Sequence, residues 1–137
     1  MTGYKKELGV RGETLACEHL ESLGFRIIGR NVHVGHDEID IIAENDTRIL
    51  FVEVKSRAGT SSNKRYGRPA SAVDYTKRSR MLRAVRQYMF DHRGEIKKAP
   101  RLDVIEVIFP PIHSDTPIDI SRLIPQKLDH ITNAVHE

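Results

Sequence analysis

Two consecutive apolar runs joined by a short turn constrain the fold of this chain more than any other feature. The runs are "EIDIIAE", residues 38–44, and "RILFVEVKS", residues 48–56, and the stretch "ENDT" connects them tightly. Strands joined by so short a turn pair as an antiparallel hairpin. Because both runs are rich in large apolar residues, we expect the hairpin to lie in the interior of a sheet.

Both runs also carry ionisable side chains, which a core strand seldom does. Side chains alternate along a strand, so Glu38 and Asp40 share one face of the first run, and Glu53 and Lys55 share one face of the second. Buried charge is costly unless it is paired or holds a metal. The pattern therefore indicates a functional site. The alternative for Glu53 and Lys55 is a surface ion pair of little energetic worth.

Helical patterns precede and follow the hairpin. Residues 12–24 predict a helix that ends at Gly24, because a glycine just past the last apolar residue supplies a left-handed cap. Residues 70–92 predict a second, longer helix with an apolar stripe. The expected inward side of the first helix, which also holds Glu13, contains Val10, Ala16, Cys17, Leu20 and Leu23.

Two further strands complete the expected order of elements. Residues 25–32, "FRIIGRNV", and residues 101–109, "RLDVIEVIF", have the composition of strands. A short helix is expected at residues 125–135, and Asp103 is expected to be structural. The fold class is therefore α/β, in the order helix, three strands, helix, strand. Because no repeat or domain boundary interrupts this order, we expect a single domain over residues 1–137.

The composition bounds the class of protein. Of the 137 residues, 39% are hydrophobic and 30% are charged, as in an ordinary globular domain. Cys17 is the one cysteine, so no internal disulfide can form. No apolar run approaches the length of a membrane span, and the N-terminal sequence lacks the apolar core of a secretory signal. These features predict a cytoplasmic protein that has no membrane partner.

Positive charge is concentrated in one segment. Between Lys55 and Arg101 the chain has 14 lysines and arginines against three acidic residues. Such segregation is the usual footprint of a polyanion, and a solvated helix face is the alternative. We expect nucleic acid as the partner, DNA in preference to RNA. The residues expected to contact it are Arg57, Lys64, Arg65, Arg68, Lys77, Arg80 and Arg83.

Three acidic residues from separate elements are expected to converge at one end of the sheet. Glu13, Asp40 and Glu53 would supply oxygen ligands for a hard divalent cation such as Mg²⁺ or Mn²⁺. With Lys55 beside them, these groups provide the parts that metal-assisted phosphodiester hydrolysis requires. Glu13 has an equal alternative as an acid that suits the helix dipole near a helix start. Lys77 is either a phosphate contact or a lysine that extends its ammonium past an apolar stripe.

The order of Asp40, the hairpin and "EVK" resembles the PD-(D/E)xK nuclease superfamily, and Glu13 matches an additional acid of its archaeal Holliday-junction resolvases. The segments "LGVRGETLACEHLESLGFRIIGRN", "EIDIIA", "FVEVKSR", "GRPASAVDYTKRSRM" and "LDVIEV" are similar, in the same order, to those of the YraN-like family of bacterial endonuclease-like proteins. The resemblance implies a restriction-endonuclease-like fold, with a central mixed sheet of four to five strands flanked by helices.

The resemblance also implies roles for individual residues. The three converging acids bind Mg²⁺ or Mn²⁺, and Asp40 and Glu53 act in catalysis together with Lys55. Glu38 and Lys77 are further candidates for the site. The implied function is metal-dependent cleavage of DNA, on branched or structured substrates in repair or recombination. By analogy with the junction resolvases, a homodimer is also expected.

Two other functions stay open at this stage. The first is a nucleic-acid-binding module that keeps the nuclease fold with little or no catalytic turnover. The second is a protein-interaction surface built from the charged strand ends, which predicts no affinity for metal ions.

Overall fold

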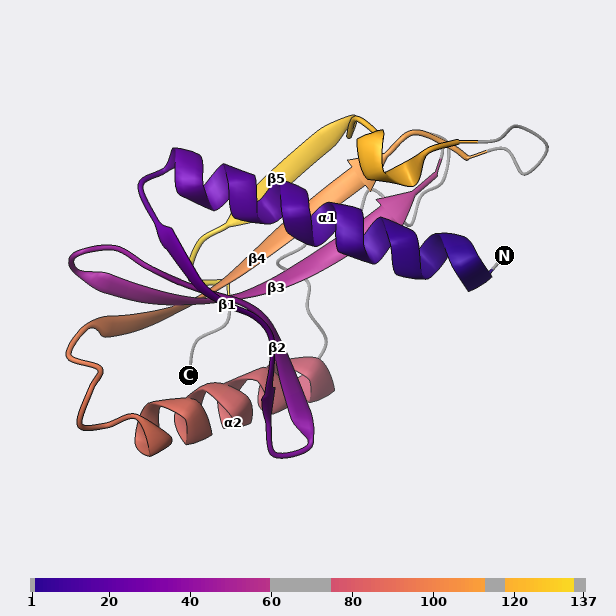
Figure 1. The fold of residues 1–137 in the computed structure, drawn as a ribbon. Helices are drawn as coiled ribbons and strands as arrows, with labels where there is room; N and C mark the ends of the chain where they lie inside the picture. The colour runs from indigo at the N-terminus through magenta and orange to yellow at the C-terminus, as the bar shows by residue number, and fades with distance from the viewer. Residues whose placement is uncertain (1, 60–74, 113–117, 135–137) are drawn as a thin grey trace.

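The computed structural model describes residues 2–59, 75–112 and 118–134, which form a mixed five-stranded sheet with a helix on each face (Figure 1). The strands lie in chain order, and β3 and β4 are parallel while the other neighbours are antiparallel. Within these ranges, no helix combines the length and apolar character needed to cross a membrane. The elements are α1 (Thr2–Ser22), β1 (Arg26–Val34), β2 (Asp37–Glu44), β3 (Arg48–Ala58), α2 (Tyr75–Asp91), β4 (Ala99–Phe109), the short 3₁₀ helix η2 (Ile120–Arg122) and β5 (Lys127–Ile131).

This architecture confirms the expected α/β class and the order of helix, three strands, helix and strand. The hairpin of β2 and β3 is antiparallel, with Ile41 opposite Val52. Its turn is held by Asn45, whose Oδ1 accepts hydrogen bonds from the backbone N–H groups of Thr47 at 3.0 Å and Arg48 at 2.8 Å. Asparagine favours turns because its side chain can bind the backbone a few residues on. Hydrogen bonds within the turn itself therefore stabilise the hairpin that the sequence predicts.

The helix α1 covers one face of the sheet (Figure 1). Ala16, Cys17 and Leu20 are buried in a core against the apolar residues of the strands, as predicted. Val10 and Leu23 were expected in the same stripe, but they are 57% and 53% exposed. Side chains four residues apart share a helix face, and Val10 lies off the row that meets the sheet. Leu23 follows the last helical residue, where the helical period no longer applies.

Gly12 lies where α1 packs directly against β3. A Cβ atom at this position would overlap the Oγ of Ser56 and would lie 3.7 Å from the Cγ1 of Val54. The absence of a Cβ atom therefore permits the close approach of the helix to the strand. Because Glu13 is the next residue of α1, the same contact fixes where this acid lies relative to the sheet.

The helix α2 covers the opposite face, at the bottom of the view in Figure 1. Ala84 and Val85 are buried in a second core. Tyr88 packs edge-on against Phe51 of β3, with 5.5 Å between the ring centroids. The predicted apolar stripe is confirmed along this helix. The first part of the predicted helix, residues 70–74, lies outside the described residues.

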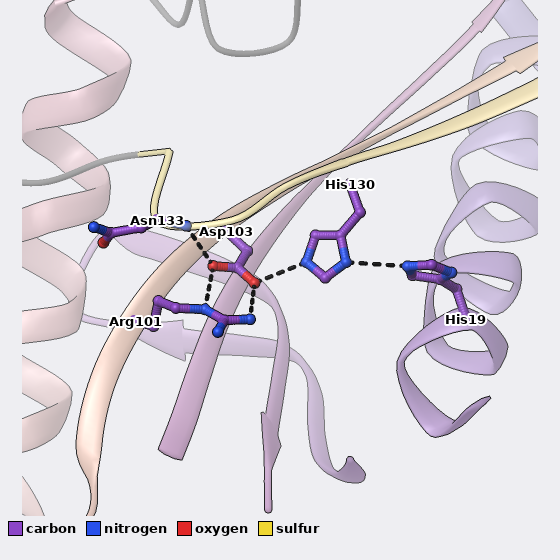
Figure 2. A network of polar contacts seen from close by, with 5 residues as sticks. All are labelled: His19, Arg101, Asp103, His130 and Asn133. Carbon is purple, nitrogen blue, oxygen red and sulfur yellow. Dashed lines mark hydrogen bonds and ion pairs between the residues drawn. The ribbon is translucent and has the colours of Figure 1, made fainter. Parts of the chain in front are cut away.

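The C-terminal segment differs from the prediction, because residues 127–131 form the strand β5 and not part of a helix. The cause is Asp103 of β4, which is fully buried. Its carboxylate binds the His130 ring at 2.8 Å, and it accepts hydrogen bonds from the backbone N–H of Asn133 at 2.9 Å and from the Arg101 guanidinium at 2.9 and 3.0 Å (Figure 2). The contacts with His130 and Asn133 fix β5 beside β4. These two residues lie too far from Asp103 in the sequence for a local pattern to show the contacts.

The same network reaches α1 through a contact between two imidazoles. The Nε2 atom of His19 lies 3.0 Å from the Nδ1 atom of His130 (Figure 2). Burial, and then the neighbouring His130, lower the pKa of His19. Burial alone would raise the pKa of Asp103, but the hydrogen bonds from His130, Arg101 and Asn133 lower it below its ordinary value. The structural role expected for Asp103 is therefore to join β4, β5 and α1.

Candidate active site

The candidate site lies where the β2–β3 ladder ends. The last paired residues at that end are Ile41 and Val52. Beyond them, the Oδ2 atom of Asp40 accepts a hydrogen bond of 2.8 Å from the backbone N–H of Val54. The Asp40 side chain thus accepts the hydrogen bond that a backbone carbonyl of β2 would accept in a regular ladder. The pairing of β2 with β3 stops at this point. This local change of partner brings Asp40 to the face of the sheet that carries Glu53.

Glu53 is buried and Asp40 is partly buried. The side chain of Glu53 is 10% exposed. Burial, together with the carboxylates of Glu13, Glu53 and Glu38, raises the pKa of Asp40 to about 6, in spite of the Val54 hydrogen bond. Burial and the neighbouring acids therefore both oppose the ionisation of Asp40.

These two acids line one pocket between the β2 end and α2. The pocket has a volume of about 310 Å³. Its polar lining includes Glu38, Lys77 and Arg80 in addition to Asp40 and Glu53. Ile39, Val52, Val54 and Met81 supply apolar walls. Carboxylates and cations therefore open into the same solvent-accessible space.

Lys77 reaches from α2 into this pocket and forms an ion pair with Glu53. Its ammonium contacts the Oε2 atom of Glu53. That oxygen is buried, and within the described ranges it accepts no hydrogen bond of ordinary geometry. The lysine side chain itself is 48% exposed. Lys77 was predicted as a phosphate contact or a snorkelling lysine, and its pairing with Glu53 was not anticipated.

Glu13 lies close to Asp40 but does not line the pocket. Its Oε1 atom accepts a hydrogen bond of 3.1 Å from Asn31 and lies 3.6 Å from the guanidinium of Arg30. Asn31 of β1 has a positive φ of 51°, and its side chain reaches α1 through this hydrogen bond. The first acid of the predicted triad is thus turned toward β1, while it still adds to the field at Asp40.

Lys55 follows Glu53 on the same face of β3, and a buried acid of β4 lies opposite it. Burial, and then Lys77, lower the pKa of Lys55. The register pairs Lys55 with Glu106. Glu106 is 2% exposed and its Oε2 atom lies 3.2 Å from the Nε atom of Arg57. The sequence did not single out Glu106, although an acid inside the apolar run "VIEVI" is the same signal that identified Glu53.

Residues 12–107 match a family model described as "Uncharacterised protein family UPF0102". The chain belongs to the UPF0102 family. This assignment confirms the resemblance to the YraN-like family. The matched range contains every site candidate predicted from the sequence.

Three UPF0102 proteins illustrate the extent of the similarity. One from Alkaliphilus oremlandii is 42% identical over 103 residues, which cover 74% of this chain and 85% of the relative. One from Clostridium kluyveri is 38% identical over 109 residues, which cover 80% and 85% of the two chains. One from Syntrophomonas wolfei is 35% identical over 129 residues, which cover 94% and 97%. The last of these aligns with this UPF0102 chain almost from end to end.

The pocket of this UPF0102 chain contains oxygen donors of the kind that a divalent cation prefers. Among the residues that the structure describes, no three Asp, Glu, His or Cys side chains form a complete metal cluster. Mg²⁺ is commonly bound by one or two carboxylates, and waters and substrate phosphates complete the shell. Asp40 and Glu53 are such a pair. Both carboxylates line the same pocket.

The basic residues expected to contact nucleic acid are placed differently from one another. Arg80 lines the pocket. Arg83 donates two hydrogen bonds of 3.0 Å to Asp37, so it fixes α2 against β2. Arg57 is turned toward Glu106. Lys64, Arg65 and Arg68 lie outside the described residues.

Proposed function

We propose that this chain is a divalent-metal-dependent endonuclease that hydrolyses phosphodiester bonds of DNA, with branched or otherwise structured DNA in repair or recombination as its substrate. One observation supports the proposal most. Asp40 and Glu53, two shielded carboxylates from neighbouring strands, line one pocket together with the cations Lys77 and Arg80. A scaffold that needed only stability would gain nothing from an acid whose ionisation is opposed by its surroundings.

Each acid has a specific part in the proposed reaction. Asp40 and Glu53 would hold the cation, and Glu13 and Glu38 would add negative charge around it. A bound Mg²⁺ or Mn²⁺ would polarise the scissile phosphate and lower the pKa of a coordinated water. Because the pKa of Asp40 is about 6, this carboxylate is mostly ionised and ready to bind a cation at neutral pH.

The lysines and arginines contribute to the handling of protons and phosphate. Lys55 adjoins Glu53, and its lowered pKa makes proton exchange with an attacking water or a leaving oxygen easier. Arg80 lies at the pocket wall, where its planar guanidinium suits a phosphate oxygen pair. Such contacts hold the sugar–phosphate chain and do not read the base sequence. Action as a homodimer remains a prediction.

A nucleic-acid-binding module without turnover is the second candidate. The ion pair between Lys77 and Glu53 favours it, because a carboxylate that is already paired has less need of a metal. The arrangement of Asp40 supports the nuclease more, since a binding surface for a polyanion has no use for extra buried acids. The two functions differ in turnover, which is measurable.

The experiment that tests the proposal is cleavage of a panel of end-labelled DNAs, namely linear, flapped and four-way, with Mg²⁺ or Mn²⁺. The variants are Glu53→Gln and Lys55→Met, and the matched controls are the exposed Glu95→Gln and Lys97→Met. Metal-dependent cleavage that disappears in both site variants and persists in both controls would support the nuclease. Metal-independent binding without cleavage of any substrate would favour the binding module.

A further inference from the structure

In the Lys77–Glu53 ion pair, the flexible side chain of Lys77 contacts the buried side chain of Glu53. Glu53 lies in the middle of the sheet and its side chain is 10% exposed, whereas the side chain of Lys77 is 48% exposed. A lysine ammonium sits on a flexible four-carbon stem and can swing without any movement of the backbone. The contact can therefore open from the solvent side while Glu53 stays in place.

The pair leaves the charges of the pocket only partly balanced. Lys77 neutralises Glu53, but within the described ranges Asp40 has no ion pair and accepts a hydrogen bond only from the neutral N–H of Val54. A divalent cation would bring two positive charges to two carboxylates, where an ammonium brings one to a single carboxylate. Because the charges lie close together in a shielded site, the larger charge of the divalent cation makes its attraction to the carboxylates stronger than that of the ammonium.

We infer that Lys77 is a displaceable counter-ion of the metal site: Glu53 exchanges the Lys77 ammonium for a divalent cation shared with Asp40, and Lys77 then binds a phosphate of the nucleic acid. This inference rests on the proposed function. Arg80, one helical turn further along α2, lines the same pocket, so a phosphate bound there lies within reach of both side chains.

The exchange couples two binding events through one side chain. While Glu53 holds Lys77, the metal must compete with an internal cation, which weakens its binding. Once Lys77 is displaced, an additional ammonium is available for phosphate. By linkage, bound cation strengthens nucleic-acid binding and bound nucleic acid strengthens cation binding by the same factor.

Isothermal titration with Mn²⁺, without nucleic acid, tests the first half of the exchange. Lys77→Gln removes the competing ammonium, and we expect it to bind Mn²⁺ about fivefold or more tightly than the wild type. Lys77→Arg keeps the charge and should retain the weak wild-type affinity. Lys97→Gln is the matched control, because it removes an exposed lysine that does not line the pocket, and we expect a change below about twofold.

Fluorescence anisotropy with a labelled DNA, in EDTA and in Ca²⁺, tests the second half. The oxygen ligands of the site also suit Ca²⁺. Ca²⁺ should strengthen DNA binding by the wild type, and this gain should shrink in Lys77→Gln and persist in Lys77→Arg. Thermal unfolding of each variant in EDTA shows that the fold is retained.

The outcomes separate this inference from the proposed function. Equal Mn²⁺ affinity of the wild type and Lys77→Gln would overturn the exchange and leave the nuclease standing. A parallel change in Lys77→Arg would also overturn it, because the effect would then follow from packing and not from charge. A tightened Mn²⁺ affinity in Lys77→Gln, with no cleavage of any DNA, would support the exchange and contradict the nuclease. Absence of Mn²⁺ binding in every protein would overturn both.

Discussion

The carboxylate of Asp40 replaces a backbone acceptor for Val54, because its Oδ2 atom accepts a 2.8 Å hydrogen bond from that residue's N–H group. The β2–β3 ladder ends where this side chain replaces the backbone acceptor, since the last pair of the ladder is Ile41 and Val52. One side chain thereby ends the pairing of two strands and directs an acid into the pocket. The position of Asp40 in the candidate site follows from this hydrogen bond.

Replacing Asp40 with Asn should stabilise the metal-free protein at alkaline pH. Asn keeps an oxygen for the Val54 N–H and removes a charge that the site disfavours. The folded pKa, about 6, lies above the ordinary 3.8, so the stability that Asp40 provides in its neutral form is lost as pH rises through about 6. In EDTA at pH 8 we expect the free energy of unfolding of Asp40→Asn to exceed that of the wild type by roughly 1–3 kcal/mol.

Urea unfolding at pH 8 and at pH 4 checks the sign of this effect. The gain should vanish near pH 4, where Asp40 is protonated in the folded chain and about half protonated in the unfolded chain. Asp46→Asn, in the exposed hairpin turn, is the control. A variant that is less stable than the wild type at pH 8 would show that the Asp40 charge is well satisfied without metal.

Two glycines of α1 should respond in opposite ways to the same substitution. Gly12→Ala forces a Cβ atom into Ser56, and we expect a loss of about 1–3 kcal/mol in the free energy of unfolding. Within the described ranges, a Cβ atom on Gly9 would meet no atom of another element within 4 Å, so Gly9→Ala should gain up to about 1 kcal/mol from helix propensity. The double variant Gly12→Ala, Ser56→Gly should recover most of the loss. Equal effects of the two alanines in urea unfolding would contradict the close approach.

Removing the charge of Asp103 should release β5. Asp103→Asn leaves Arg101 without its buried partner, and we expect a loss of about 3 kcal/mol or more in the free energy of unfolding. Hydrogen exchange should rise first in residues 127–131. Asp129→Asn, on the partly exposed side of the same strand, is the control. A variant as stable as this control would show that the network is dispensable.

Acidification should weaken the contact between α1 and β5. The folded pKa of His19 lies below its ordinary 6.5, so the folded chain binds fewer protons and stability is lost as pH falls through about 6.5. Asp103, whose pKa is lowered, loses its contribution only below 3.8. Between pH 7 and pH 5, the melting temperature of His19→Gln should therefore fall less than that of the wild type. His33→Gln changes an imidazole that is 77% exposed and should behave like the wild type.

Nucleic-acid binding should be strongly dependent on salt. The logarithm of the affinity should fall linearly with the logarithm of the salt concentration, with a slope of about −0.9 for each phosphate contacted. Arg80→Gln should make the slope shallower by about one contact. Arg122→Gln removes an arginine that is 87% exposed on η2, against α1, and should leave the slope unchanged. A wild-type affinity that is insensitive to salt would contradict an electrostatic interface.

The features that sequence predicted are those with a local cause. The β2–β3 hairpin, the strand that carries Glu53 and Lys55, and the apolar stripe of α2 each follow from residues close together in the chain. The place of Asp40 in the pocket was also predictable, because this residue breaks an otherwise apolar pattern. A short window is sufficient for features of this kind.

The remaining features depend on contacts between distant segments. The strand β5 was expected as a helix, because its main partner, Asp103, is 27 residues away from His130. The ion pair of Glu53 with Lys77 depends on how α2 is placed against the sheet. Glu106, like Glu53, is an acid inside an apolar run, so the same rule could have identified it. The parallel pairing of β4 with β3, which places Glu106 opposite Lys55, is not visible in the sequence.

The proposed function requires that Asp40 and Glu53 together bind a divalent cation. Anomalous X-ray diffraction from crystals soaked in Mn²⁺ tests this directly, since it locates the ion without reference to activity. We predict an anomalous peak within about 2.0–2.4 Å of a carboxylate oxygen of each residue, with the Lys77 ammonium moved away from Glu53. A fully soaked crystal with no peak between the two carboxylates, and with Lys77 still on Glu53, would contradict the claim.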